Sequence, residues 1–300
     1  LHARLVRPPH YLATLKSLDE NLIERFDESN ISVVRDGNFV AVAAPDEYAA
    51  IKAATRLSAS AKWDLEGGLP AKDLFDALTS NKRISLPIAP GGAPVEEPVP
   101  PLVGLAEKAS VSISARFEKP YHMHGSIGPS AGCALFKENK LTVWTHNQGV
   151  YPLRGAMAEA LKMDKDDIHV AFVPGSGCYG HNGADDAAYD AALIARAIPN
   201  KPILLKWTRD DEHAWEPYGS AMVCELHASL GEGGRVINWS HESYGDTHMG
   251  RPAPGRSGSP AEKLLSTHLQ EKPLAHASDR AQEHQKRNAR ADFFLKHFSS

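Results

Sequence analysis

The stretch that decides the fold runs from residue 168 to residue 197 and reads IHVAFVPGSGCYGHNGADDAAYDAALIARA. It opens with a largely apolar, partly β-branched run, which predicts a buried strand over Ile168–Val173. After four glycines, an alanine-rich segment predicts a helix over Asp185–Ala197 that stops before Pro199-Asn200. Its inward face is expected to carry Ala188, Ala191, Ala192 and Ala195.

A strand, a glycine loop and a helix in this order direct backbone N–H groups at an anion or an oxo group. The glycines of the loop are Gly175, Gly177, Gly180 and Gly183. We therefore expect a polar or negatively charged ligand to approach the main chain here.

One candidate ligand is a dinucleotide, because GSGCYG matches the G-x-G-x-x-G fingerprint of Rossmann-type NAD(P) oxidoreductases. Against it, the predicted helix begins after Gly183, and Asp185 and Asp186 would repel a pyrophosphate at its N-terminus. The next acid at a strand end, Asp210, lies about thirty residues beyond the last glycine, whereas the fingerprint places it about twenty residues on. The dinucleotide interpretation stays as the alternative.

Bulk composition excludes several classes of function. A net charge of −4 and a pI near 6.4 give no electrostatic support for nucleic-acid or anionic-membrane binding. No apolar run approaches about eighteen residues, and no signal peptide is visible, although LHARLVRPP resembles the middle of a protein. The cysteines, Cys133, Cys178 and Cys224, form neither a disulfide framework nor an iron–sulfur site. Electrons from any redox reaction would therefore leave through another subunit or domain.

The fold class expected is α+β, with three parts. Residues 1–83 form a small α/β domain, with a hairpin at Asp36-Gly37 and a helix from Asp46 to about Lys62 whose inner face includes Ile51. The proline-rich residues 84–110 form a linker. The third part, 111–300, alternates strands and helices; strands are expected at VSISARFEKPY, LTVWTH and PILLKW, a helix over Pro152–Met163, a hairpin around GEGG, and a charged arm over 275–292.

Histidines provide the only metal-ligand spacing. His122-x-His124 would place two imidazoles on one face of a strand, with His146 or His181 as a third ligand. The alternative is coincidence, since the chain has 15 histidines and no carboxylate adjoins this pair.

Other candidate site residues are single side chains. Gln148 ends a strand and precedes a helix, so its carboxamide could point into a site. Tyr179 in the glycine loop either packs into the core or covers a ligand. Cys178 lies near a helix N-terminus, where a thiol becomes more acidic, although we favour a non-nucleophilic role. An aromatic trio (Trp207, Trp215, Tyr218) could line an apolar pocket for an aromatic substrate, although such trios usually belong to the core. The residues Asp210, Asp211 and Glu212 are expected to form a solvated acidic turn that pairs with Arg209.

Several long blocks in order resemble one known family. They are HARLVRPP, PYHMHGSIGPS, WTHNQGVYPLRGAMAEAL, GSGCYGHNGADDAAYDAALIARA and KWTRDDEHAWEPYGSAM. Together they resemble the molybdopterin-binding large subunit of the xanthine dehydrogenase/aldehyde oxidase family, in its nicotinate and isoquinoline dehydrogenase branch. The resemblance runs from residue 2 to about residue 250 and implies an α/β-hammerhead-like domain at 1–83. The first, incomplete part of a molybdenum-cofactor-binding domain would then occupy 111–300.

The resemblance also implies site residues and a cofactor. The cofactor would be molybdenum-molybdopterin, in some members as the cytosine dinucleotide, with molybdenum held by the cofactor's dithiolene rather than by protein ligands. Gln148 matches a glutamine beside an oxo ligand, and Tyr179 takes the place of an aromatic residue beside the substrate. The backbone amides of the loop, at Gly175, Gly177, Cys178, Tyr179 and Gly180, would contact the cofactor.

The reaction implied is hydroxylation of an aldehyde or an N-heteroaromatic compound with water as oxygen source. Electrons would pass to a separate iron–sulfur subunit. The family's general-base glutamate is expected beyond Ser300, so the chain is expected to be an N-terminal fragment that is inactive alone. The family's arginine-proline signature is altered here to Glu216-Pro217-Tyr218, which leaves the substrate class open. A remnant of this fold without cofactor is a further alternative.

Overall fold

The structure is a computed structural model that describes residues 1–65, 73–80, 108–245, 251–252, 259–274 and 295–298. Its contacts divide the chain into two compact units. The first comprises 1–69, 123–218 and 250–277, and the second comprises 70–122, 219–249 and 278–300. Mixed sheets with helices confirm the α+β class. Most of the predicted linker 84–110 lies outside the described residues, so the boundaries expected at 83 and 111 stay predictions.

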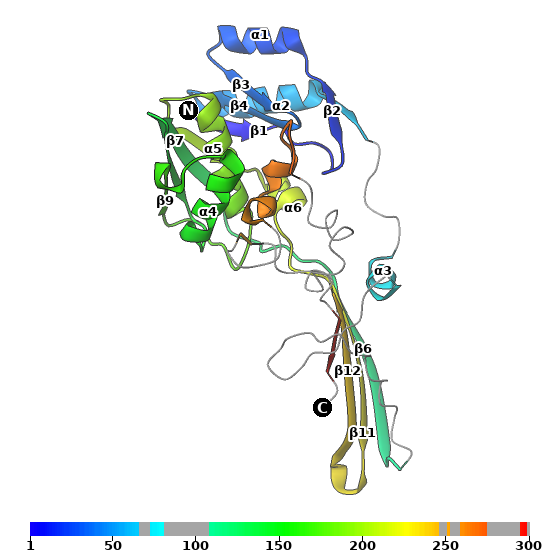
Figure 1. Ribbon diagram of the computed structural model, residues 1–300. Helices are drawn as coiled ribbons and strands as arrows, with labels where there is room; N and C mark the ends of the chain where they lie inside the picture. The colour runs from blue at the N-terminus through cyan, green and yellow to red at the C-terminus, as the bar shows by residue number, and fades with distance from the viewer. Residues whose placement is uncertain (66–72, 81–107, 246–250, 253–258, 275–294, 299–300) are drawn as a thin grey trace. The chain divides into compact units, whose positions relative to one another are not determined.

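The first unit is built on a seven-stranded sheet (Figure 1). Its order is β3-β4-β1-β10-β7-β8-β9, in which β1/β10 and β8/β9 are parallel and the other pairs antiparallel. The strands are β1 (His2–Leu5), β3 (Ser32–Asp36), β4 (Phe39–Ala44), β7 (Ala131–Lys137), β8 (Lys140–Thr145), β9 (Ile168–Phe172) and β10 (Ile203–Lys206). A separate pair joins β2 (Thr14–Ser17) to β5 (Lys62–Asp64). A Rossmann fold needs a mostly parallel, doubly wound sheet, so the dinucleotide alternative is wrong.

Helices cover both faces of this sheet, and β4 shows how. Phe39, Ala41 and Ala43 enter one core, while Val40 and Val42 alternate into the other. The second core also contains residues of α1 and α2, and the first contains residues of α4 and α5. The helices of the first unit are α1 (Glu20–Glu28), α2 (Glu47–Ser60), α4 (Val150–Leu161), α5 (Ala184–Ala197) and α6 (Arg209–Trp215), with 3₁₀ turns at Lys165–Asp167, Pro260–Lys263 and Leu265–His268.

Local signals account for most of these elements. Asp46 caps α2 by accepting from the amide of Ala49 at 2.8 Å, and the β3–β4 hairpin turns at Gly37 with φ +64°. The strand and helix predictions around β6, β8, β10 and α4 are also confirmed. The inward orientation predicted for Ile51 is wrong, because its side chain is exposed and α2 packs through Ala50, Ala53, Ala54 and Leu57.

The predicted environment of the central stretch needs two corrections. β9 is the edge strand beside β8, and only alternate side chains on it are buried, so it is not buried throughout. By contrast, α5 is buried from Ala184 to Ala195 rather than on one face. It packs on β7, β8 and β10 and also contacts the 3₁₀ turn at Leu265–His268. Alanines suit a helix that is enclosed in this way, since they let backbone approach backbone.

The second unit is a four-stranded antiparallel sheet in the order β13-β12-β11-β6. Its strands are β6 (Val111–Lys119), β11 (Met222–Leu230), β12 (Val236–Gly245) and β13 (Leu295–Phe298), and α3 (Leu74–Ser80) packs on β11. The predicted β11–β12 hairpin is confirmed; the charged arm expected over 275–292 lies outside the described residues. No helix in the described part of the chain is long and apolar enough to cross a membrane.

Candidate functional site

The glycine loop, which we define as residues 174–183, links β9 to α5. Its backbone has positive φ at Gly177 (+103°), Tyr179 (+53°) and Gly180 (+120°). A Cβ at Gly175 would lie 2.5 Å from His146 Cβ, so the loop packs directly on the end of β8. The N-cap residue of α5, Gly183, has no side chain to cap the helix, and within the loop Asn182 accepts from the amide of Ala184. The loop therefore presents main chain rather than side chains at the start of a buried helix.

Tyr179 is the exception within this loop. Its side chain is 61% exposed, so it does not enter the core. A Cβ on Gly177 would lie 2.6 Å from Tyr179 Cζ and 2.8 Å from Oη, so the ring folds back over Gly177. Of the two placements considered for Tyr179, the exposed ring over the loop is the one observed.

Cys178 has a structural role in the loop. Its side chain is buried, and Sγ donates to the carbonyl of Gly180 at 3.3 Å and to Oδ1 of Asn182 at 3.1 Å. Asn182 also accepts from the amide of Ala184 at 3.1 Å, which joins the loop to the first turn of α5. A thiol has a single hydrogen, which these two acceptors share, and both acceptors belong to the loop itself, as expected for a structural cysteine.

The segment 124–130 supports the glycine loop from one side. The amide of His181 donates to His124 Nε2 at 3.2 Å, Asn182 Nδ2 donates to Ser126 Oγ at 3.0 Å, and Ser176 Oγ donates to the carbonyl of Gly128 at 2.9 Å. These bonds hold three points of the loop against a single extended segment. The sequence placed this segment in one of the blocks that carry the family resemblance, but it did not predict these contacts with the loop.

Two carboxylates, Glu212 on α6 and Glu216 at the C-cap of α6, anchor that segment in turn. Glu212 Oε1 accepts from the amide of Ser130, and Glu216 Oε1 accepts from the amide of His124, each at 2.6 Å. Both side chains are buried, so the prediction of a solvated acidic turn is wrong for Asp211 and Glu212. Asp211 completes a capping box with Thr208, and Arg209 donates to the carbonyl of Ile127 instead of pairing with the acids. Helical spacing of four residues brings the two glutamates together.

Burial raises the pKa of Glu216 to about 7, and a hydrogen bond with Glu212 acts in the same direction. The folded chain therefore binds a proton that the unfolded chain releases above about pH 4.5. Glu216 stabilises the fold fully below about pH 4.5, and this contribution disappears as the pH rises through about 7.

We expect Glu216→Gln to remove this pH dependence. Between about pH 4.5 and 7.5 the wild type should lose on the order of 2 kcal/mol of unfolding free energy relative to the variant. Chemical denaturation of both proteins across this range measures the difference, with Glu24→Gln, at an exposed position on α1, as the control. Parallel profiles for wild type and Glu216→Gln would contradict the prediction.

The histidines do not gather as metal ligands. His122 pairs through its backbone with Gly219, and His124 and His181 meet through a ring nitrogen and a backbone amide. Burial lowers the pKa of His181 to about 4 against the attraction of Asp185, so the imidazole is neutral near pH 7. Within the described ranges, no group of three His, Cys, Asp or Glu side chains could hold a metal ion. The metal interpretation of His122-x-His124 finds no support there.

Gln148 lies at the exposed end of the segment after β8 and contacts a residue that sequence reasoning missed. Arg251 Nη1 donates to Gln148 Oε1 at 3.2 Å, and Nη2 lies 3.4 Å from Asp185 Oδ2 and 3.6 Å from Cys178 Sγ. Asp185 is buried and accepts from Asn147 Nδ2 at 2.8 Å. Arg251 thus connects the two predicted halves of the site, Gln148 and the glycine loop. Its position in a proline- and glycine-rich stretch gave no periodic signal.

The aromatic trio does not form one pocket. Trp207 is buried and donates from Nε1 to Asp190 at 3.1 Å. The Arg7 guanidinium lies 4.9 Å from the Trp207 ring and 5.6 Å from the Trp215 ring, and Nη2 bonds to Asp190 at 2.7 Å. Tyr218 instead donates to the carbonyl of His213. The structural interpretation of Trp207 and Trp215 therefore holds.

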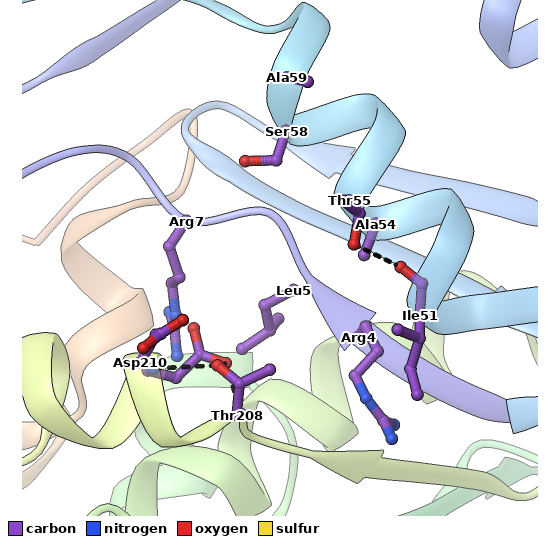
Figure 2. Close-up of a pocket in the computed structure, with 11 residues that line it drawn as sticks. Arg4, Leu5, Arg7, Ile51, Ala54, Thr55, Ser58, Ala59, Thr208 and Asp210 are labelled. Atoms are coloured by element: carbon purple, nitrogen blue, oxygen red, sulfur yellow. Dashed lines mark hydrogen bonds between the residues drawn. The ribbon is translucent and has the colours of Figure 1, made fainter. Parts of the chain in front are cut away.

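The described part of the first unit contains two cavities that could hold a ligand. One of about 160 Å³ lies among β7, β8 and the start of the glycine loop; it is lined in part by Cys133, Trp144, His146, Gly175 and Ser176. The other, of about 420 Å³, is shown in Figure 2 and is lined by residues of β1, α2 and α6. Its two arginines already have carboxylate partners: Arg4 binds Glu47 and Arg7 binds Asp190. Neither cavity is lined by Gln148, Tyr179 or Arg251.

The polar groups around the glycine loop fit an oxygen-rich cofactor. They are mainly donors: backbone amides, the Gln148 carboxamide and the Arg251 guanidinium. Arg251 Nε and Asn147 Oδ1 are buried without a hydrogen-bond partner in the described part of the chain. The charge of Asp185 is opposed by Arg251, which removes the repulsion expected at the start of α5.

The sequence matches proteins of known function. A family model described as the molybdopterin cofactor-binding domain matches residues 103–254. A nicotinate dehydrogenase chain of Pseudomonas putida is 33% identical over 253 residues, which cover 81% of this chain and 20% of that protein. The aldehyde oxidoreductase molybdenum-binding subunit of Escherichia coli K12 is 29% identical over 142 residues, 47% of this chain and 19% of that protein. The chain thus spans about a fifth of the length of these relatives.

Solved structures support the same fold. Aldehyde oxidoreductase from Desulfovibrio gigas gives a TM-score of 0.56 at 16% identity, covering 79% of this chain and 30% of that one. Quinoline 2-oxidoreductase from Pseudomonas putida 86 gives 0.57 at 15% identity, covering 79% and 35%. At this identity the likeness concerns the fold alone. Because the family model spans more than half of the sequence, the chain belongs to the molybdopterin cofactor-binding domain family.

Proposed function

We propose that this chain supplies part of the cofactor site of a molybdenum hydroxylase. The observation that carries the proposal is the glycine loop, which presents backbone at the start of α5 with Gln148 and Tyr179 beside it. The bound group would be molybdenum-molybdopterin, and the cytosine dinucleotide form belongs to the proposal. When bound, this cofactor supplies the redox and oxygen-transfer chemistry.

The residues of the chain divide the remaining tasks. Amides of Gly175, Gly177, Cys178, Tyr179 and Gly180 would bind the cofactor's oxygen atoms, while Gln148 donates to one of them. The exposed Tyr179 ring would form one wall for a flat substrate. We propose an aldehyde or N-heteroaromatic substrate and an iron–sulfur partner subunit. The proton acceptor is expected from outside this chain.

Molybdenum content tests this proposal. The protein is produced with its neighbouring subunits in a host that makes the cofactor, and we expect close to one molybdenum per chain by elemental analysis. Release of a cytosine nucleotide on acid hydrolysis would identify the dinucleotide form. Dye-linked oxidation of nicotinate, isoquinoline and benzaldehyde would then separate the substrate classes. Absence of molybdenum from such a preparation would instead favour a remnant that has lost its cofactor.

A further inference from the structure

The Gln148 carboxamide has an oxygen and a nitrogen that differ chemically, and the groups around it determine which way each atom points. A carboxamide carries one acceptor oxygen and one donor nitrogen, whereas a guanidinium carries only donors. Since Arg251 Nη1 lies 3.2 Å from the Gln148 tip, the oxygen faces Arg251 and the nitrogen faces away from it. The donor end of Gln148 is then the end available to another group.

We propose that Arg251 is a positioning residue, which holds the Gln148 carboxamide so that its N–H donor is presented to an oxygen ligand of the cofactor. This inference rests on the proposed function and adds a residue to it. Without Arg251 the amide could rotate by half a turn and present its oxygen instead. Two oxygen atoms would then face each other, which is repulsive.

Arg251 is itself held by a buried acid. Nη2 lies 3.4 Å from Asp185 Oδ2, and Asp185 is only 1% exposed. Asp185 also accepts from Asn147 Nδ2 at 2.8 Å, so it secures the residue that precedes Gln148. The four side chains Asn147, Asp185, Arg251 and Gln148 form a continuous hydrogen-bonded chain. This chain starts at Asn147, the residue before Gln148, and ends at the Gln148 side chain.

The positive charge that faces Asp185 comes from Arg251 and not from His181. His181 Nε2 lies 3.6 Å from the same oxygen of Asp185, but that imidazole is neutral near pH 7. A guanidinium suits the position because its two terminal nitrogens reach different acceptors, Gln148 and Asp185. A lysine ammonium would keep the charge but could not keep both contacts in this geometry.

The test uses the molybdenum-loaded holoenzyme with four variants: Arg251→Lys, Gln148→Ala, their double variant, and Gln148→Glu. We expect Arg251→Lys to retain molybdenum within about twofold of wild type and to lose about 10- to 100-fold in kcat per molybdenum, with KM changed by less than about threefold. Gln148→Ala should lose about 100-fold or more. Gln148→Glu should be as inactive as Gln148→Ala, since a carboxylate can bond to Arg251 but has no donor left.

The double variant decides the matter. If Arg251 acts through Gln148, Arg251→Lys should cause little further loss in the Gln148→Ala background. Two losses that multiply, or an Arg251→Lys variant with wild-type kcat per molybdenum, would overturn the inference. A wild-type protein without molybdenum would instead refute the proposed function, so the two failures are distinguishable. Arg25→Lys on α1 is the matched control and should change neither quantity.

Discussion

Replacing Gly132 by alanine is expected to destabilise the first unit by roughly 3 kcal/mol, one of the largest effects of any single added methyl group in this chain. Gly132 lies in β7, an interior strand between β10 and β8, and is paired with Leu205 on one side and Thr145 on the other. A Cβ there would lie 2.7 Å from the carbonyl oxygen of Ala187 and 2.7 Å from Ala188 Cα. Both atoms are backbone of α5, so no side chain can rotate away.

The helix would have to move off the sheet. The alanines of α5 suit a helix that is enclosed on both sides. A shift of the helix would therefore disturb the packing on both sides at once. A fall in the thermal midpoint of roughly 6–12 °C is expected. Gly132→Val should not yield folded protein.

Gly155→Ala is the matched control for this experiment. Gly155 lies inside α4, and a Cβ there meets nothing within 4 Å. That substitution should stabilise the chain by about 0.5–1 kcal/mol, because alanine is the better helix former. Equal midpoints for Gly132→Ala and wild type would show that α5 does not pack on β7 as described.

Local rules explain what the sequence could predict. Capping by Asp46, the turn at Asp36-Gly37 and the period of α4 depend on residues close together in the chain, and all three were confirmed. The glycine loop was located because four glycines stand between a strand and a helix. The family resemblance assigned a ligand to that loop, which the residue pattern alone left open.

The errors came from long-range packing. Glu212 looks solvated from its acidic neighbours, yet a segment some eighty residues earlier offers it the amide of Ser130. The helix α5 has an amphipathic pattern but is enclosed, because the turn at Leu265–His268 covers its outer side. Arg251 gave no signal, since its partners Gln148 and Asp185 are brought near it only by the fold. A buried charge is tolerated when it is paired, but the neighbouring sequence does not show which distant residue will pair with it.

The structure places the six predicted site residues in separate small groups. Gln148 and Cys178 both contact Arg251, and Gly177 lies under the Tyr179 ring. Gly175 packs on His146, and Gly180 faces His124. Their roles toward a cofactor stay proposals, and the loop itself offers the sharpest test of them.

Gly177→Val is expected to abolish cofactor incorporation while the chain still folds. With φ at +103°, Gly177 adopts a conformation that side chains avoid at a cost of about 1–3 kcal/mol. The new Cβ would also displace the Tyr179 ring, from which it would lie 2.6 Å. Because that ring is exposed, it can swing into solvent without disturbing the core. Molybdenum content should fall below about a tenth of wild type, by the steric argument that backbone must face the ligand here.

Two controls separate the ring from the backbone. Gly233→Ala carries the same type of strain, with φ +77° and open space around the Cβ, and should retain full molybdenum content. In the double variant Gly177→Ala/Tyr179→Ala the collision is removed while the backbone strain remains. If molybdenum returns there, the ring was the obstacle; if it stays absent, the peptide groups of Gly177 themselves bind the cofactor. A Gly177→Val protein with full molybdenum content would mean that this loop does not face the cofactor at all.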